Sequence, residues 1–238
     1  MTVQEAPRRA ERPTRRQPRN TALTVFGVGL LVIGLACLGY VGYQFFGTNI
    51  ASQQAYEETT ERLEREWAEP APDAGEDEEE DQQGGTPAVR IPGDAIGLLR
   101  IPDLGPDYVV PILTGTDVDT LTRGVGWYDS SVGPGELGNF AVAGHRVTHG
   151  EPFRQLLELD EGAEIEVETR DAIYTYRLLT APRDLTVNDT ETWVLQPDPV
   201  NRSNEATREI MTLTTCQDFF HSPDRSVAFA ELVETSNK

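Results

Sequence analysis

The stretch EIEVETRDAIYTYRLL, at residues 164–179, indicates the fold most clearly. Its first five residues, Glu164–Glu168, alternate strictly between charged and apolar side chains, which is the pattern of a strand with one buried face. Its end, Ile173–Leu179, includes β-branched, aromatic and leucine residues, as strands often do. The stretch therefore predicts two consecutive strands.

Segments of the same kind occur on both sides of this stretch, separated by proline and glycine residues. They are Ala95–Arg100, Tyr108–Ile112, Asn139–Ala143, Glu209–Thr215 and Val227–Val233. So many short strands at this spacing predict an all-β fold, in which the strands form a closed or nearly closed antiparallel barrel. Short helices are expected at Thr116–Arg123 and Pro152–Leu159, and helix content should otherwise be low outside the apolar N-terminal segment.

The overall composition narrows the class of protein. The chain has 238 residues and a formal net charge of −20, which argues against a nucleic-acid partner because DNA and RNA are polyanions. Its 38% hydrophobic and 25% charged residues allow a folded core together with polar segments. Two cysteines, Cys37 and Cys216, are too few for a disulfide framework.

The N-terminal segments predict a membrane anchor. Residues 1–20 form a basic tail, in which six arginines face only two glutamates. Residues 21–46 contain no charged side chain, and as a helix they would be about 39 Å long, enough to cross a hydrocarbon core of ~30 Å. Arginines before such a span keep the N-terminus in the cytoplasm. The sequence therefore predicts a single-pass membrane protein whose remaining chain is extracellular.

Two kinds of cleaved segment are the alternatives to an anchor. A signal peptide usually ends in small residues, whereas this span ends with Phe45 and Phe46. A lipoprotein signal would need an aliphatic residue three positions before Cys37, where Gly34 stands. An uncleaved transmembrane anchor at residues 21–46 is therefore favoured.

Residues 47–93 predict a disordered acidic linker, which leaves residues 94–238 as the folded extracellular domain. Glu57–Glu69 is expected to form at most a short helix. The acidic run at residues 76–81 repels itself, and it lacks the spaced ligands and glycine of a calcium-binding loop, so a solvated spacer is favoured over a calcium site. Because residues 1–90 contain no expected catalytic group, a chain that starts near Pro92 is expected to be active.

Cys216 and Arg225 are the first candidates for chemistry. Cys216 ends one predicted strand, and Arg225 opens the next one nine residues later, so that neighbouring antiparallel strands would place the two side by side. A cationic neighbour lowers the pKa of a thiol and can also hold a developing oxyanion. From this spacing alone, a buried and unreactive thiol is the favoured interpretation.

Motifs in a fixed order change that interpretation. TLTTC at Thr212–Cys216 is followed by Arg225, and FAVAGHR stands at Phe140–Arg146, within GVGWYDSSVGPGELGNFAVAGHRVTHGEPF at Gly124–Phe153. Together with IGLLRIPDLG at Ile96–Gly105, these motifs resemble the actinobacterial class E sortases. The resemblance covers nearly all of the extracellular domain and implies a closed eight-stranded sortase-type β-barrel.

The resemblance also implies an activity and its residues. It implies a cysteine transpeptidase in which Cys216 is the nucleophile, His145 is the general acid and base, and Arg225 steadies the substrate and the oxyanion. Such an enzyme cleaves an LPxTG- or LAxTG-type sorting signal between Thr and Gly, and a thioester then passes the protein to an amine of a peptidoglycan precursor. The implied partners are secreted proteins with C-terminal sorting signals and that precursor. No cofactor or metal is implied.

Thr215, Trp127 and His149 are candidate residues of the substrate groove, although Thr215 and Trp127 also suit a strand and a packed core. His145 and His149 have the spacing of a helical zinc site, but the glycines around them favour a loop. The loop before the catalytic strand is longer and more polar than is usual in the family, so the choice between LPxTG and LAxTG stays open.

A function of a different class is a non-catalytic extracellular sensor or adhesin on the same barrel, in which Cys216 is structural. Labelling of the thiol would separate the two functions. A reactive Cys216 that a sorting peptide quenches favours the enzyme, whereas a thiol that labels only after denaturation favours the binding module.

Overall fold

The computed structural model describes residues 21–69, 93–218 and 222–238. The chain divides into two compact units, with the boundary between Gly42 and Tyr43. In the first unit, α1 (Thr21–Gly42) is an apolar helix of 22 residues, which corresponds to a length of about 33 Å. Among the described residues, one helix is long and apolar enough to cross a membrane, and it begins at Thr21. The expected N-terminal apolar helix is confirmed, and its orientation stays a prediction.

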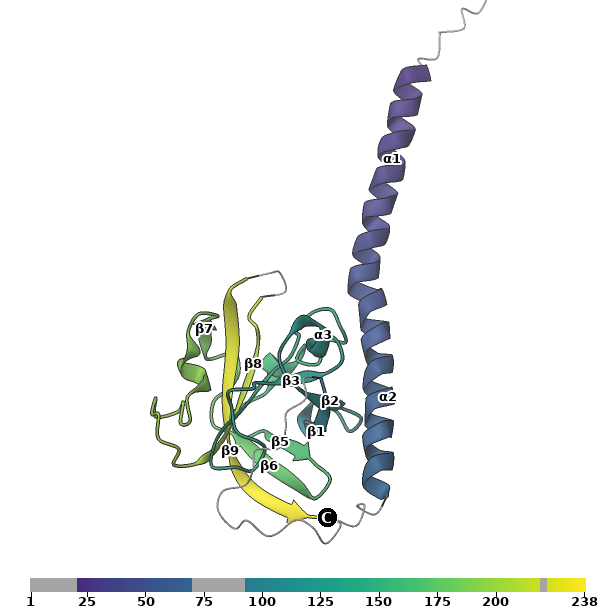
Figure 1. Ribbon diagram of the computed structural model, residues 1–238. Helices are drawn as coiled ribbons and strands as arrows, with labels where there is room; N and C mark the ends of the chain where they lie inside the picture. Colours follow the sequence, from purple (N-terminus) through teal and green to yellow (C-terminus); the bar gives the residue numbers. More distant parts are fainter. Residues whose placement is uncertain (1–20, 70–92, 219–221) are drawn as a thin grey trace, which may run out of the picture. The chain divides into compact units, whose positions relative to one another are not determined.

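Eight strands of the second unit close into a barrel, in the order β6-β5-β1-β2-β3-β4-β8-β9, and pairing of β9 with β6 completes the ring (Figure 1). A further strand, β7 (Thr186–Asn188), lies outside the ring on β9. The predicted closed eight-stranded barrel is confirmed. The ring strands are β1 (Ala95–Arg100), β2 (Val109–Thr114), β3 (Val125–Trp127), β4 (Gly138–Ala143), β5 (Glu164–Glu168), β6 (Ala172–Leu178), β8 (Glu209–Cys216) and β9 (Asp224–Asn237).

The barrel is not antiparallel throughout, which corrects the sequence-based expectation. β2 and β3 are parallel, and so are β4 and β8. Parallel neighbours need a crossover connection. The short helix α3 (Val118–Leu121) lies in the first crossover, and β5, β6 and β7 make up the second. The second parallel pair has a direct consequence for the site, because it sets the end of β4 beside the end of β8.

The seven strands predicted from the sequence are all present, and two others, β3 and β7, are not predicted. Each of these two has only three residues, too few to show an alternating pattern. The expected helix at Thr116–Arg123 contains α3, whereas Pro152–Leu159 forms only a 3₁₀ turn. The 3₁₀ turns are η2 (Pro102–Leu104), η3 (Leu156–Glu158) and η4 (Thr192–Leu195).

Part of the predicted linker is helical, because α2 covers Thr48–Ala68. The expectation of a disordered linker from residue 47 is therefore wrong over these residues. The expectation of little helix outside the apolar segment is wrong as well. This helix has 21 residues and follows a short π-helical segment, η1 (Tyr43–Gly47). It contacts β1 and β2 of the barrel. The rest of the predicted linker, including the acidic run at residues 76–81, lies outside the described residues.

Few residues of α2 are apolar, and two of the large ones, Tyr56 and Leu63, are buried. Tyr56 is 3% exposed and Leu63 is 4% exposed, whereas most of the charged residues between them are exposed. Fully burying a large apolar side chain stabilises a protein by about 1.5–3 kcal/mol, which explains how a mostly polar segment can be folded. Arg100 of β1 lies near Glu64 of α2 at 3.8 Å and adds a weak, solvent-exposed ion pair.

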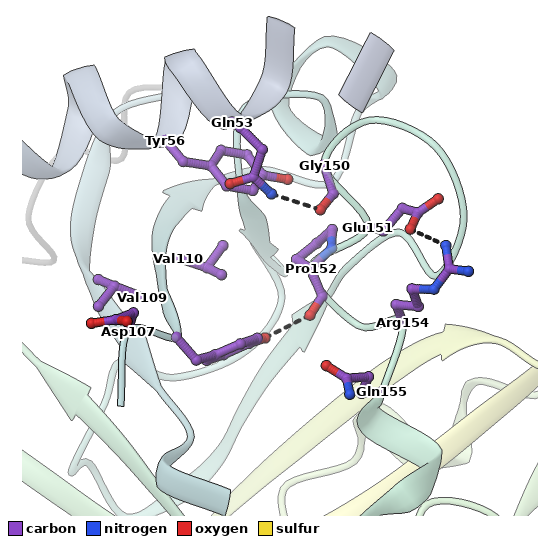
Figure 2. A pocket seen from close by; sticks show the side chains of 11 residues that line it. Gln53, Tyr56, Asp107, Val109, Val110, Gly150, Glu151, Pro152, Arg154 and Gln155 are labelled. Carbon is purple, nitrogen blue, oxygen red and sulfur yellow. Dashed lines mark hydrogen bonds and ion pairs between the residues drawn. The ribbon is translucent and has the colours of Figure 1, made fainter. Parts of the chain in front are cut away.

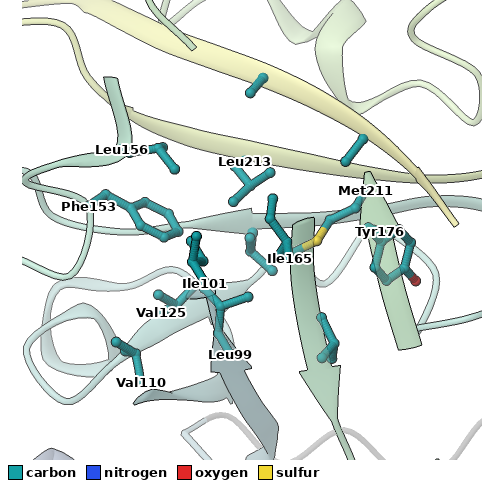
Figure 3. Packing of buried hydrophobic residues seen from close by; sticks show 14 of the residues in the cluster. Leu99, Ile101, Val110, Val125, Phe153, Leu156, Ile165, Tyr176, Met211 and Leu213 are labelled. Atoms are coloured by element: carbon teal, nitrogen blue, oxygen red, sulfur yellow. The ribbon is translucent and has the colours of Figure 1, made fainter. Parts of the chain in front are cut away.

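A cluster of buried apolar side chains fills the barrel (Figure 3). A second, smaller cluster lies under β7 and η4 and consists of Val187, Val194, Val227 and Phe229. Because successive residues of a strand point to opposite faces, β9 contributes Ala228 and Ala230 to the first cluster and Val227 and Phe229 to the second. β9 therefore separates two apolar layers, and the outer one supports the site described next.

Candidate active site

Cys216 and Arg225 lie opposite each other at the ends of two paired strands. Cys216 is the last residue of β8, Arg225 is the second residue of β9, and the register of the two antiparallel strands pairs them directly. Cys216 is a free, half-buried thiol. The strand register therefore pairs the two residues, as expected from their spacing.

His145 reaches the same end of the barrel through β4. The parallel pairing of β4 with β8 ends at Ala143 and Thr214, and two further hydrogen bonds extend it by one residue. Gly144 N donates to the carbonyl of Thr214 at 3.1 Å, and the hydroxyl of Thr215 donates to the carbonyl of Gly144 at 2.8 Å. His145 is the residue that follows Gly144, and Cys216 is the residue that follows Thr215, so both stand where this pairing of the two strands ends.

The environment of His145 keeps its ring neutral. Burial, and to a smaller extent the nearby His149, lower the pKa of His145 to about 4, and the centres of the two rings lie 5.0 Å apart. Within the described part of the chain, Nε2 of His145 is buried and has no hydrogen-bond partner. A buried ring nitrogen without a partner costs free energy, and a catalytic role is one explanation for such a group.

Three acceptors fix the guanidinium of Arg225. Nη1 donates to the carbonyls of Ser222 at 2.6 Å and of Asp224 at 3.1 Å. Nη2 lies 3.3 Å from the carboxylate of Asp189, on the loop that follows β7. A guanidinium carries five N–H donors, so N–H groups are left for a substrate oxygen. No sequence pattern indicates Asp189, because its contact with Arg225 depends on the pairing of β7 with β9.

A pocket of about 260 Å³ opens beside Arg225. Apolar side chains of the second cluster and of η4 form part of its wall, and Tyr128 and Thr214 also line it. The hydroxyls of Tyr128 and Thr214 lie 3.2 Å apart. Since Thr214 donates to the carbonyl of Val142, Tyr128 is the donor in this pair. The described residues contain no group of three or more His, Cys, Asp or Glu side chains placed to hold a metal ion.

Residues 99–233 match the family model of the sortase domain. The chain belongs to the sortase family. It is 31% identical to Sortase SrtE1 of Streptomyces coelicolor over 233 residues, which cover 92% of this chain but only 60% of that protein. The fold and the family together support a cysteine transpeptidase.

Solved structures of class E sortases resemble this chain over the barrel. Sortase E from Streptomyces avermitilis is 33% identical, with a TM-score of 0.56 over 62% of this chain and 93% of that one. Sortase E1 from Streptomyces coelicolor, solved with a tripeptide in its active site, is 32% identical, with a TM-score of 0.52 over 63% of this chain and 94% of that one.

Of the three predicted groove residues of this sortase, two are buried in the barrel and the third, His149, lies beside His145. Thr215 is buried, and its hydroxyl donates to the carbonyl of Gly144, just after β4. Trp127 is also buried, and its ring nitrogen donates to the hydroxyl of Ser131 at 2.9 Å. Neither lines the pocket, whereas their sequence neighbours Thr214 and Tyr128 do, because adjacent strand residues face opposite sides. His149 lies against His145 in the loop after β4.

Proposed function

We propose that this sortase is a membrane-anchored cysteine transpeptidase, with Cys216 as nucleophile, His145 as general acid and base, and Arg225 as the oxyanion-stabilising cation. One observation carries the proposal. Two adjacent strand pairings, β4 with β8 and β8 with β9, bring an imidazole, a thiol and a guanidinium to one end of the barrel. These three groups are what acyl transfer through a thioester requires.

The first half of the reaction forms the acyl-enzyme. Neutral His145 accepts the proton of Cys216 as the sulfur attacks the substrate carbonyl, which gives a tetrahedral oxyanion. Arg225 donates to that oxygen through its remaining N–H groups, and its existing bonds to Ser222 and Asp224 hold it in position beforehand. Protonated His145 then gives its proton to the departing amine, and a thioester on Cys216 remains.

The second half transfers the acyl group to a new amine. The incoming amine attacks the thioester carbonyl, Arg225 again stabilises the oxyanion, and His145 accepts the proton that the amine loses. The thiolate leaves and regains a proton from His145, which restores the starting state. His145 therefore serves as base and as acid in alternation, which suits a ring that is neutral before the reaction begins.

The substrates follow from this reaction and from the resemblance to class E sortases. The donor is a secreted protein with an LPxTG- or LAxTG-type signal, cleaved between Thr and Gly, and the acceptor is an amine of a peptidoglycan precursor. The pocket beside Arg225 supports a donor with an apolar residue, because Val187, Val194 and Val227 line it. The N-terminal apolar helix would keep the enzyme at the outer surface of the membrane.

A peptide assay tests the proposal. The full chain in detergent is incubated with LAxTG and LPxTG peptides and an amine acceptor, and mass spectrometry follows three species: the peptide cleaved after Thr, the product joined to the amine, and the thioester on Cys216. All three should form with at least one peptide. Binding of both peptides without cleavage would instead favour the non-catalytic sensor or adhesin.

A further inference from the structure

The loop that carries His145 has an unusual backbone. Thr148, His149, Gly150 and Glu151 all have positive φ angles, of 64°, 49°, 79° and 50°. Three of these four residues have side chains, and residues with side chains rarely adopt this left-handed conformation. Such a conformation persists only where the surrounding structure holds it. The loop therefore needs external contacts to keep its shape.

Those contacts come from the beginning of α2. Tyr56 donates its hydroxyl to the carbonyl of His149 at 2.9 Å, and Gln53 donates to the carbonyl of Gly150 at 3.1 Å. Gly150 N donates to the side-chain oxygen of Asn49 at 3.0 Å, and His149 N lies 3.4 Å from the hydroxyl of Thr48. The first turns of α2 thus satisfy both backbone polar groups of His149 and of Gly150.

Tyr56 also determines how closely the helix and the loop approach. Its ring lies over Gly150, where an added Cβ atom would meet the Tyr56 hydroxyl oxygen at 2.6 Å (Figure 2). Tyr56 belongs to the main buried cluster, and burial raises the pKa of its hydroxyl, which stays a neutral donor. On the other side of the loop, Tyr108 donates to the carbonyl of Pro152 at 2.6 Å.

The loop held by α2 begins at His145, the proposed catalytic histidine, and its far end bonds back to the same residue. Phe153 N donates to the carbonyl of His145 at 2.9 Å, so the two ends of the loop are joined. Inside the loop, His149 places its ring against His145, and its Nδ1 lies 2.9 Å from the hydroxyl of Thr148. A shift of His149 would open one wall of the site in which the His145 ring is held.

We propose that the first turns of α2 are a working part of the active site, in which Tyr56 and Asn49 are positioning residues for His145. The proposal rests on the proposed transpeptidase function. It assigns a catalytic contribution to a segment that follows the apolar helix after only the five residues of η1. Neither residue touches the reacting atoms, and both act through the backbone of residues 148–151.

The test compares Tyr56→Phe and Asn49→Ala with two matched controls in the full chain. Tyr176→Phe removes a hydroxyl on β6 that accepts from Gly135 N and, among the described residues, has no hydrogen bond to the histidine loop, and Gln54→Ala changes an exposed neighbour of Gln53. Steady-state kinetics with a sorting peptide give kcat and KM. Hydrogen exchange followed by mass spectrometry reports on residues 144–153, and a melting curve reports on stability.

Tyr56→Phe and Asn49→Ala should each lower kcat by about 10- to 100-fold, the cost typical of a catalytic group misplaced by about 1 Å, and should leave KM unchanged. Exchange in residues 144–153 should become faster in both. The two controls should keep the wild-type kcat and the wild-type exchange in this segment, even if Tyr176→Phe lowers the melting temperature.

Folded Tyr56→Phe and Asn49→Ala proteins with wild-type kcat would overturn the proposal, whatever their exchange shows. Equal losses of kcat in Tyr176→Phe would also overturn it, because general destabilisation would then explain the result. If the wild-type chain does not cleave any sorting peptide, the proposed function fails. The exchange data would still decide whether α2 orders the histidine loop.

Discussion

The two sides of the candidate active site are built in different ways. Cys216 and Arg225 stand on β8 and β9, whose regular register of seven residue pairs fixes them relative to each other. His145 begins an irregular loop with four consecutive left-handed residues, and contacts from a separate helix hold that loop. A strand pair keeps its geometry through its own backbone bonds, whereas the loop depends on a neighbour.

The site can therefore be disturbed on the loop side without unfolding the barrel. Local openings of a folded protein involve first the segments with few buried contacts, and these are commonly loops. Changes on the strand side should therefore act through lost chemistry, and changes on the helix side through lost alignment. Variants on the two sides distinguish these two kinds of effect.

The largest effect is expected on the strand side, for Cys216→Ala. No acyl-enzyme can form without the thiol, so cleavage should fall to the detection limit. The melting temperature should barely change, because a half-buried side chain at a strand end contributes little packing. Mass spectrometry of the reaction and a melting curve check both parts. Cleavage by the variant would show that another residue is the nucleophile.

Arg225→Lys should lower turnover by roughly 10²–10³-fold, as the loss of an oxyanion donor does. An ammonium keeps the positive charge near Asp189, but it cannot bond the carbonyls of Ser222 and Asp224 and reach the substrate oxygen at once. Asp189→Asn is the matched control, since it removes only the charge that faces Arg225. It should change kcat by no more than a few fold. Near wild-type turnover in Arg225→Lys would reduce Arg225 to a nearby charge.

Removal of α2 is the corresponding experiment on the helix side. A chain that starts at Tyr43 should retain the activity of the full chain, because it contains the whole second compact unit. A chain that starts at Pro92 should lose activity by about 10- to 100-fold, mainly in kcat, since the histidine loop loses its bonds to α2. The sequence alone predicts the opposite. Equal kcat values for the two shortened chains would show that the loop holds its own shape.

The regular side of the site is also the side that the sequence predicts best. Alternation within β5 and the strand pattern of β8 are local properties, and the placement of Cys216 beside Arg225 follows from two neighbouring strands. The parallel pairing of β4 with β8 is not predicted. This pairing depends on the path of the chain between β4 and β8, and no local sequence pattern indicates that path.

The helix side is missed for the same physical reason. In α2 only a few residues are buried, and the segment therefore has the composition of a solvated linker. The role of Tyr56 depends on a loop 93 residues later in the chain, so neither periodicity nor composition can indicate it. The roles of Cys216, His145 and Arg225 come from family resemblance and stay predictions until variants are measured.

The smallest expected effect concerns the pH dependence of stability. In the folded protein the pKa of His145 is about 4, whereas an unfolded histidine has a pKa of about 6.5. Between these two values the unfolded chain binds more protons than the folded protein, so stability falls as the pH falls through this window. His145→Gln removes this contribution. Its melting temperature should therefore drop less than that of the wild type between pH 7.5 and pH 4.5, by a few degrees.

His149→Gln tells whether burial or charge causes the low pKa of His145. Burial is the larger cause and His149 the smaller one, so a neutral residue at position 149 should leave most of the acid sensitivity in place. Tyr56→Phe should remove more of it, because a loosened loop lets water reach His145. Calorimetry of the three variants and the wild type at both pH values measures these differences. A His149→Gln protein as insensitive to acid as His145→Gln would mean that the charge of His149, rather than the enclosure that α2 maintains, keeps His145 neutral.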